Sequence, residues 1–287
     1  MNFVYGIICH QLTNPLIFLV NELIKSPHSI IIIHVDKKKD IYTIKSQILE
    51  HAQIHFIEDR VDVQWGGYSQ IDATLKLLNY AQEFDYKYFS LLSGDDIPLK
   101  DVNTIEKFLL ESGKEFLGHD KYVDPIPRVK YIYPDFFYER NKSFIKKIAC
   151  KIVSNLHKLG FLKQNLDQLP ILYKGTSWFT LSKEAIQYIL RYIEKNPNYD
   201  VAFQKSYCGD EVYFHTIIYN SPFKENLNLD YGLTPPEMAL RYIDWKTGPD
   251  YPRILDDMDF DRMQKSNTLF ARKVKKNISF ELLKKNF

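Results

Sequence analysis

The stretch YFSLLSGDDIPL, residues 88–99, begins as a buried strand and ends in a tight loop. Tyr88 to Leu92 form a short apolar run of the kind found in parallel strands that are covered on both faces. Ser93-Gly94 ends the run, and Pro98 prevents the strand from continuing. The stretch therefore predicts a strand of an α/β sheet with a polar loop at its carboxyl end.

Two adjacent carboxylates, Asp95 and Asp96, occupy that loop. Ligands of open α/β sheets bind in the crevice beyond the carboxyl ends of the strands, so these side chains are placed for chemistry. The alternative is that an aspartate only caps the following helix, which Asp101 could begin equally well. This stretch alone leaves both interpretations open.

Strands and helices alternate on the N-terminal side of this stretch. We expect strands at 3–9, 29–35 and 53–57, and helices that begin with Asn14 as N-cap, near residue 40 (to about 50) and with Ser69 as N-cap. Four alternations within 110 residues call for an α/β fold with a mostly parallel central sheet flanked by helices.

On the C-terminal side the alternation stops between residues 112 and 170, although 116–118 reads as a strand. We expect a basic, partly amphipathic helix over 142–162, a strand over 172–181 with a glycine kink, a helix from Ser182 to about 195, and a helix over 210–220. We interpret the chain as one domain over 1–287. Its parts are a nucleotide-sugar half (1–110), an acceptor and catalytic half (111–276) and a basic tail (277–287).

Composition excludes several classes of protein. The 287 residues are 45% hydrophobic, which excludes wholesale disorder, and the net charge of +2 gives no reason to expect a nucleic-acid partner. No window approaches the ~20 apolar residues of a membrane span, and no signal peptide is evident. The three cysteines are odd in number and far apart, so we expect reduced thiols in a cytoplasmic protein.

Glu211 is the strongest candidate for catalysis. At the first turn of a helix, free backbone N–H groups favour the ionised carboxylate, which then acts as a general base toward a nearby hydroxyl. The alternative is that Asp210 and Glu211 only complement the helix dipole. Farther on, Arg253 and the Arg272-Lys273 pair are cations suited to neutralising a leaving diphosphate, or else they are solvated surface charges.

Seven ordered blocks together resemble the core-2/I-branching β-1,6-N-acetylglucosaminyltransferase and peptide O-xylosyltransferase family, a group of inverting sugar-nucleotide transferases. The resemblance runs from about residue 2 to 276. The blocks are IIHVDKK (32–38), RVDVQWGGYSQIDATLKLL (60–78), YFSLLSGDDIPL (88–99), KGTSWFTLSKEAI (174–186), CGDEVYFHTII (208–218), RYIDW (241–245) and LFARK (269–273). Because the chain lacks the anchor, stem and cysteines of the Golgi relatives, it looks like a cytosolic bacterial-type member.

The resemblance implies a GT-A type fold and a role for each matching position. Glu211 matches the catalytic base. The implied donor-binding residues are His34, Val35, Asp36, Trp65, Gly66, Gly67, Asp96, Arg253 and Lys273, with Arg253 and Lys273 on the diphosphate and the first six around the uridine. The implied acceptor-binding residues are Arg128, Lys130 and Trp178.

The family works without a divalent metal, so the resemblance implies no metal and no other cofactor. Adjacent aspartates at 95 and 96 also lack the Asp-x-Asp spacing of metal-binding GT-A enzymes, and successive side chains of an extended chain point to opposite faces. We assign Asp96 to substrate positioning and leave Asp95 open.

The sequence thus predicts an inverting transferase that moves a sugar from a UDP-sugar to a glycan or lipid-linked glycan in bacterial surface polysaccharide synthesis. The expected donor is UDP-N-acetylglucosamine, and UDP-xylose is the second choice. The rival hypotheses are a glycoside hydrolase that uses paired carboxylates such as Asp96 and Glu211, and a catalytically silent carbohydrate-binding relative. Lysines and apolar residues alternate in the tail, so we expect peripheral contact with the inner face of the membrane. The alternative for the tail is an ordinary surface helix packed on the domain.

Overall fold

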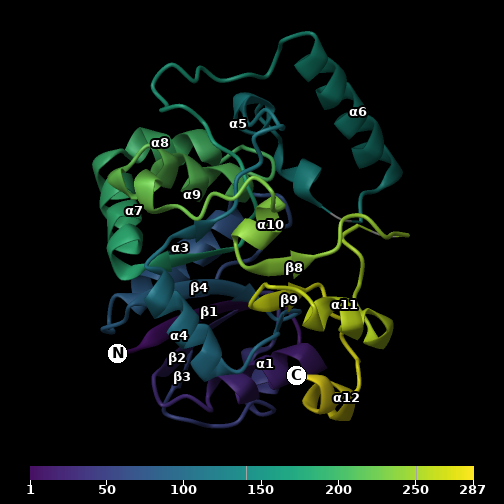
Figure 1. Cartoon of the computed structure of the whole chain (residues 1–287). Coiled ribbons are helices and arrows are strands. Elements are labelled where there is room, and N and C mark those ends of the chain that lie inside the picture. Colours follow the sequence, from purple (N-terminus) through teal and green to yellow (C-terminus); the bar gives the residue numbers. More distant parts are fainter. Residues whose placement is uncertain (140, 250) are drawn as a thin grey trace.

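The computed structural model describes residues 1–139, 141–249 and 251–287. Its central sheet has six strands in the order β3-β2-β1-β4-β7-β6 (Figure 1). The strands are β1 (Phe3–Cys9), β2 (Ser29–Val35), β3 (Ile54–Phe56), β4 (Tyr88–Ser93), β6 (Phe116–Leu117) and β7 (Phe179–Ser182). All neighbours pair in parallel from β3 to β4, while β7 is antiparallel to both β4 and β6. The expected α/β fold with a mostly parallel sheet is confirmed.

Continuous apolar sequence explains the innermost strands. All seven residues of β2 are buried, and β1 pairs with it in register from Phe3 opposite Ser29 to Cys9 opposite Val35. Such strands are hydrophobic on both sides because helices cover both faces of the sheet. Gly6 in β1 is required by packing, since a Cβ there would lie 2.3 Å from the ring of Phe89.

Helices divide between the two faces of the sheet. One face is covered by α3, α7, α8 and α9, and the other by α1, α2 and α4. The helices are α1 (Asn14–Leu23), α2 (Ile41–Lys45), α3 (Ser69–Ala81), α4 (Val102–Ser112), α5 (Ile126–Lys130), α6 (Phe144–Lys158), α7 (Lys183–Lys195), α8 (Pro197–Phe203), α9 (Asp210–Tyr219), α10 (Pro235–Met238), α11 (Phe260–Gln264) and α12 (Phe280–Asn286). Short 3₁₀ turns span Asp135–Tyr138, Pro222–Asn226 and Asp257–Asp259. Within the ranges described, no helix has both the length and the apolar character needed to cross a bilayer.

Two of the expected helix caps are confirmed and two are wrong. Asp101 caps α4 through the N–H of Thr104 (3.0 Å), and Ser182 caps α7 through the N–H of Ala185 (3.2 Å). Asn14 lies inside α1, whose cap is Thr13, because the Thr13 hydroxyl accepts from Leu16 N. Ser69 opens α3 without capping it, since its hydroxyl accepts instead from the backbone N of Gln64.

Three segments are shorter than expected. The helix that begins after residue 40 spans five residues, and the helix expected over 142–162 is α6, 144–158. The strand expected over 172–181 begins only at Phe179. Its first half instead bonds to α9, where Tyr173 N donates to the Thr216 hydroxyl (3.1 Å).

A second sheet, in the order β5-β9-β8, joins the end of the chain to the loop after β4. Its strands are β5 (Ile97–Pro98), β8 (Arg241–Ile243) and β9 (Phe270–Arg272). Beside it a third apolar cluster includes Phe18 from α1, Ile278 and, from α12, Leu283. In the tail, Val274, Ile278 and Leu283 are buried and Phe280 and Phe287 are partly buried, so this packing favours the alternative of an ordinary helix on the domain.

Candidate functional site

The candidate site lies at the carboxyl ends of β1 and β4. The connection from β1 through α1 leads to β2, which lies on one side of β1 in the sheet, whereas α3 leads into β4, which lies on the other side of β1. The crevice between the ends of β1 and β4 is therefore a topological switch point. Two backbone bonds tie the following loops to the end of β1. Asp36 N donates to Cys9 O (2.8 Å), and Gly94 N donates to Ile8 O (3.0 Å).

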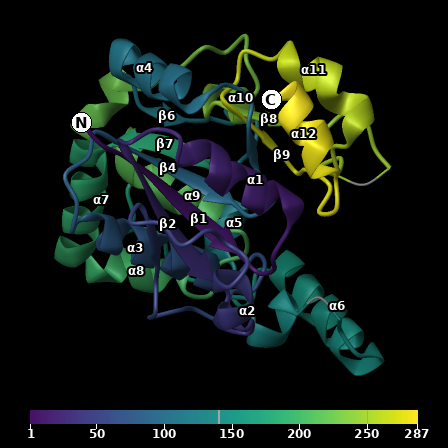
Figure 2. The ribbon, with the colours of Figure 1, turned by 90° about the horizontal axis from the view of Figure 1, so that it is seen from below.

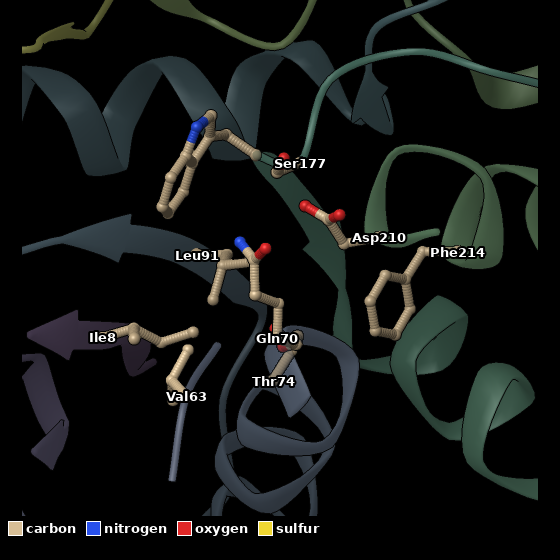
Figure 3. Close-up of a pocket in the computed structure, with 9 residues that line it drawn as sticks. Ile8, Val63, Gln70, Thr74, Leu91, Ser177, Asp210 and Phe214 are labelled. Carbon is tan, nitrogen blue, oxygen red and sulfur yellow. The ribbon is translucent and has the colours of Figure 1, made fainter. Parts of the chain in front are cut away.

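A pocket of about 50 Å³ opens in this crevice (Figure 3). Apolar side chains form most of its wall, with Asp210 and Ser177 on one side. Its lining residues are Ile8, Val63, Gln70, Thr74, Leu91, Ser177, Trp178, Asp210 and Phe214. Mostly apolar walls with a few convergent polar groups are the kind of lining found in ligand sites, although a space of about 50 Å³ is smaller than a whole ligand requires.

Glu211, the predicted base, lies in the first turn of α9 and contacts two cations. Its Oε2 atom is 3.2 Å from Arg128 Nη2 and 3.2 Å from Lys174 Nζ. The carboxylate is 27% exposed, so a ligand can reach it. The structure thus brings the predicted base together with Arg128, a predicted acceptor-binding residue on α5, and adds Lys174.

Tight backbone packing fixes Lys174 beside Glu211. The neighbouring Gly175 donates its N–H to Glu211 O (2.9 Å). A Cβ at Gly175 would lie 1.9 Å from Gly118 O and 2.3 Å from His215 Nε2, so no other residue fits without a shift of the backbone. Lys174 also lies 3.4 Å from Asp120 Oδ2, which anchors its other side.

Asp210 is buried immediately before Glu211. Burial raises the pKa of the Asp210 carboxyl to about 6, with the charge of Glu211 adding to the effect, while a hydrogen bond from Ser177 opposes it. Figure 3 shows this carboxyl beside Ser177, on the pocket side of α9. Two adjacent carboxyl groups therefore occupy different environments, one buried and one at the surface between cations.

The loop with Trp65, Gly66 and Gly67 lies against the segment that leads into α9. Cys208 N donates to Gly66 O (2.7 Å), and the Trp65 ring meets Tyr207 edge-on at 5.9 Å. Gly66 has φ +75°, a conformation that favours glycine. Trp65 is 52% exposed, so its ring is open to a ligand.

The HVD residues, also assigned to the donor, have little free surface. His34 and Val35 are fully buried, and His34 Nε2 accepts from Val61 N (2.9 Å). Burial lowers the pKa of His34 to about 4, so the ring is neutral at pH 7. Asp36 is 5% exposed and accepts from Lys38 N (3.0 Å). These side chains shape the loops after β2, and no side-chain surface of His34 or Val35 reaches a ligand.

Asp96 is fully buried and its carboxylate is bonded on both oxygens. It accepts from the Ser93 hydroxyl (2.6 Å), from Ser93 N (3.0 Å) and from Arg272 Nε (3.1 Å). Burial raises its pKa, and the charge of Arg272 opposes that shift. The Arg272 guanidinium in turn lies 3.9 Å from the ring centre of Trp178. Asp96, expected to position substrate, is therefore linked to the pocket residue Trp178 through Arg272.

Lys273 and Arg253, the expected diphosphate ligands, lie on adjoining segments, since Leu255 N donates to Lys273 O (2.8 Å). Lys273 is 32% exposed, and its Nζ atom is 3.4 Å from Asp95 Oδ2, which gives Asp95 a partner. Arg253 is bound to buried Asp259, with Nε 3.0 Å from Oδ2. Its guanidinium is therefore already paired.

The remaining expectations concern Lys130 and metal. Lys130 lies at the end of α5 with its Nζ atom 6.0 Å from the ring centre of Tyr131. Among the side chains that the structure describes, no three His, Cys, Asp or Glu residues are grouped as a metal ion would require. Metal independence stays a prediction.

Sequence reasoning did not single out Lys174 or the role of Arg272. Lys174 is the only charged residue in the run ILYKGTSWF, 171–179, which was a usable signal. Arg272 was recognised only as half of a basic pair. Its separation of 176 residues from Asp96 left no local pattern to read.

A switch-point crevice with a surface carboxylate at a helix start fits a glycosyltransferase domain. A family model described as "Branch: Core-2/I-Branching enzyme" matches residues 3–265, so the chain belongs to the core-2/I-branching enzyme family. It is 31% identical over 108 residues to Beta-glucuronosyltransferase GlcAT14B of Arabidopsis thaliana. That match covers 37% of this chain and spans only 23% of the relative's length.

Similarity to solved structures is weak. A Bacillus anthracis protein solved with sucrose, provisionally assigned as a glucose-1-phosphate thymidylyltransferase, has a TM-score of 0.32 and 15% identity, covering 65% of this chain and 74% of that one. TarS from S. aureus has a TM-score of 0.26 and 14% identity, covering 46% of this chain and 24% of TarS.

Proposed function

We propose that this chain is an inverting glycosyltransferase that moves a sugar from a UDP-sugar to a hydroxyl of a glycan acceptor. One observation carries the proposal: Glu211, partly exposed at the start of α9, is held by Arg128 and Lys174 beside the switch-point crevice. The acceptor that we propose is a glycan or lipid-linked glycan of bacterial surface polysaccharide synthesis, on the cytoplasmic side of the membrane.

In the proposed reaction, Glu211 takes the proton of the acceptor hydroxyl while that oxygen forms a bond to the anomeric carbon. The bond between this carbon and the UDP oxygen breaks, and its electron pair leaves with UDP. Both cations contact Oε2, so the other oxygen of Glu211 is the one that faces the acceptor. Lys273 neutralises the leaving diphosphate, and Arg253 joins it after exchanging Asp259 for phosphate.

Three donors deserve testing first. UDP-N-acetylglucosamine and then UDP-xylose follow from the resemblance of the seven blocks. The Arabidopsis relative is a beta-glucuronosyltransferase, so UDP-glucuronic acid is the third.

The hydrolase that pairs Asp96 with Glu211 lacks support. A hydrolytic carboxyl must contact the glycosidic oxygen or a water beside the sugar. Asp96 has no exposed surface, and both its oxygens are already bonded.

The experiment is a thermal-shift screen of the UDP-sugars at 1 mM, followed by mass spectrometry of reactions with mixed oligosaccharide acceptors. A true donor should raise the melting temperature, because a ligand at 100 times its Kd adds roughly 2.7 kcal/mol to stability. A glycosylated product together with UDP supports the transferase. Donor binding without product would support the silent relative, and free sugar from an acceptor glycan without any donor would support the hydrolase.

A further inference from the structure

Helix α6 projects from the body of the molecule (Figures 1 and 2). It leaves a broad apolar face in solvent. Of its fifteen residues, only Val153 and His157 are buried. Phe144 and Ile145 are each 77% exposed. The other exposed apolar residues of this helix and the turn after it are Ile148, Ile152, Leu159, Phe161 and Leu162.

These side chains form one surface. Phe144, Ile148 and Ile152 follow at intervals of four residues, which places them on one side of a helix, and Ile145 lies beside them. Val153 and His157 face the opposite way, toward the domain. Monomeric proteins rarely leave a contiguous apolar patch in water, so this face calls for a partner.

The charges around the face identify the partner. Lys147, Lys151 and Lys158 are exposed, and their spacing of four and seven residues forms a row along one border of the apolar face. The helix FIKKIACKIVSNLHK contains no acidic residue. An antiparallel pairing of two copies through this face would bring the two lysine rows together. Apolar side chains bordered by lysine fit the interface of an anionic bilayer.

We infer that α6, with Phe161 and Leu162, lies on the surface of an anionic membrane. The inference rests on exposure and charge and does not depend on the proposed function. It moves membrane contact from the tail, most of whose apolar residues are buried or partly buried, to a helix most of whose apolar residues are exposed.

The base of α6 is attached to the acceptor side of the candidate site. His157 Nε2 lies 3.1 Å from Ile132 O, and Gln164 N donates to Lys130 O (2.9 Å). Arg128, which contacts Glu211, is two residues from Lys130 on α5. Docking of α6 therefore holds this side of the site near lipid, which suits the lipid-linked acceptor of the proposed function.

The test is sedimentation of the full chain with vesicles of 1:1 phosphatidylglycerol and phosphatidylcholine, at low salt and without sugar substrates. We expect wild type to bind these vesicles and to ignore pure phosphatidylcholine. Phe144→Ser/Ile148→Ser/Ile152→Ser should lower the partition coefficient at least tenfold. Lys147→Gln/Lys151→Gln/Lys158→Gln should lower it on the order of 100-fold, because each lysine near an anionic surface contributes about fivefold.

The matched control is Lys275→Gln/Lys284→Gln/Lys285→Gln, which removes three charges from the tail and should change binding less than twofold. All variants alter exposed side chains, so their melting temperatures should equal that of wild type. The inference is overturned if wild type ignores anionic vesicles, or if the tail variant loses as much binding as the α6 variants. It is also overturned if wild type is a dimer in sedimentation velocity and the serine variant a monomer. Any of these results would leave the transferase proposal intact.

Discussion

At the scale of single residues, Glu211 decides whether the site is catalytic. Glu211→Gln keeps the size of the side chain and removes the base, so donor binding should persist while turnover falls by roughly 10²–10⁴. Steady-state rates and thermal shifts with the same UDP-sugar measure the two effects. The matched control is Glu184→Gln, since Glu184 holds the same second position in α7, where it is exposed. Equal rates for the two variants would return Glu211 to the helix-dipole interpretation.

Asp210 should make stability depend on pH. Its pKa of about 6 in the folded chain lies above the unfolded value of about 3.9, so the folded state binds the proton more tightly. Its contribution to stability is therefore favourable at low pH and is lost as pH rises through 6. Asp210→Asn should raise the melting temperature by a few degrees at pH 7.5, with a smaller gain at pH 4.5. Asp167→Asn, at an exposed site, should have no such effect. Equal melting temperatures of Asp210→Asn and wild type at pH 7.5 would contradict this account.

Arg272 compensates the buried charge of Asp96. Arg272→Ala leaves that carboxylate unpaired, and breaking a buried pair costs about 3–5 kcal/mol of unfolding free energy. Lys205→Ala breaks an exposed pair with Asp135 and should cost at most about 1 kcal/mol. Urea unfolding gives both values. Adding Asp96→Asn to Arg272→Ala should restore part of the loss, and similar costs for the two alanine variants would show that Arg272 has no such role.

At the scale of whole elements, α12 belongs to the core. Deleting residues 277–287 removes Ile278 and Leu283, both almost fully buried, and each contributes roughly 1.5–3 kcal/mol. We expect a fall in melting temperature of several degrees or more, measured by calorimetry. Lys275→Gln/Lys284→Gln/Lys285→Gln should melt within about 1 °C of wild type. A deletion that melts like wild type would mean that the tail is dispensable after all.

The pattern of apolar and polar residues along the chain predicted the strands whose bounds it defines by itself. The bounds of β1 and β2 agree with the structure because each is a run of apolar residues ended by polar ones. Residues 172–178 were predicted as the first part of a strand with a glycine kink, yet Gly175 bonds to α9 and not to the sheet. Which partner a segment meets is a tertiary matter that the spacing of its own residues does not encode.

A residue of the candidate site could be proposed from the sequence only where its type and its position in an element indicate a chemical role. Glu211 could be proposed because a carboxylate at a helix start acts either as a partner of the helix dipole or as a base, and its catalytic role stays a prediction. Lys174 and Arg272 gain their roles only from contacts across the fold, with Glu211 and with Asp96. The donor-binding roles of His34 and Val35 came from resemblance alone and stay predictions, and because both side chains are buried such a contact would have to come from the backbone.

At the scale of the whole molecule, charge neutralisation is expected from the protein and not from a metal. Transfer activity should stay within about twofold in excess EDTA, because Lys273 and Arg253 are proposed to take the diphosphate. Rates with and without 10 mM EDTA measure this, with a manganese-dependent glycosyltransferase run in parallel as control. Complete loss of activity that Mn²⁺ restores would contradict the cationic site.

The ion pair between Asp96 and Arg272 can form only late in the synthesis of the chain. The two residues are 176 positions apart, and translation proceeds at roughly 5–20 residues per second. A nascent chain that has already paired β1, β2 and β4 therefore waits on the order of 10–35 s, with an uncompensated carboxylate, before the ribosome delivers the arginine. The last β-strand to emerge, β9, brings Arg272 to Asp96 and Trp178, so a stalled or prematurely terminated chain lacks these contacts.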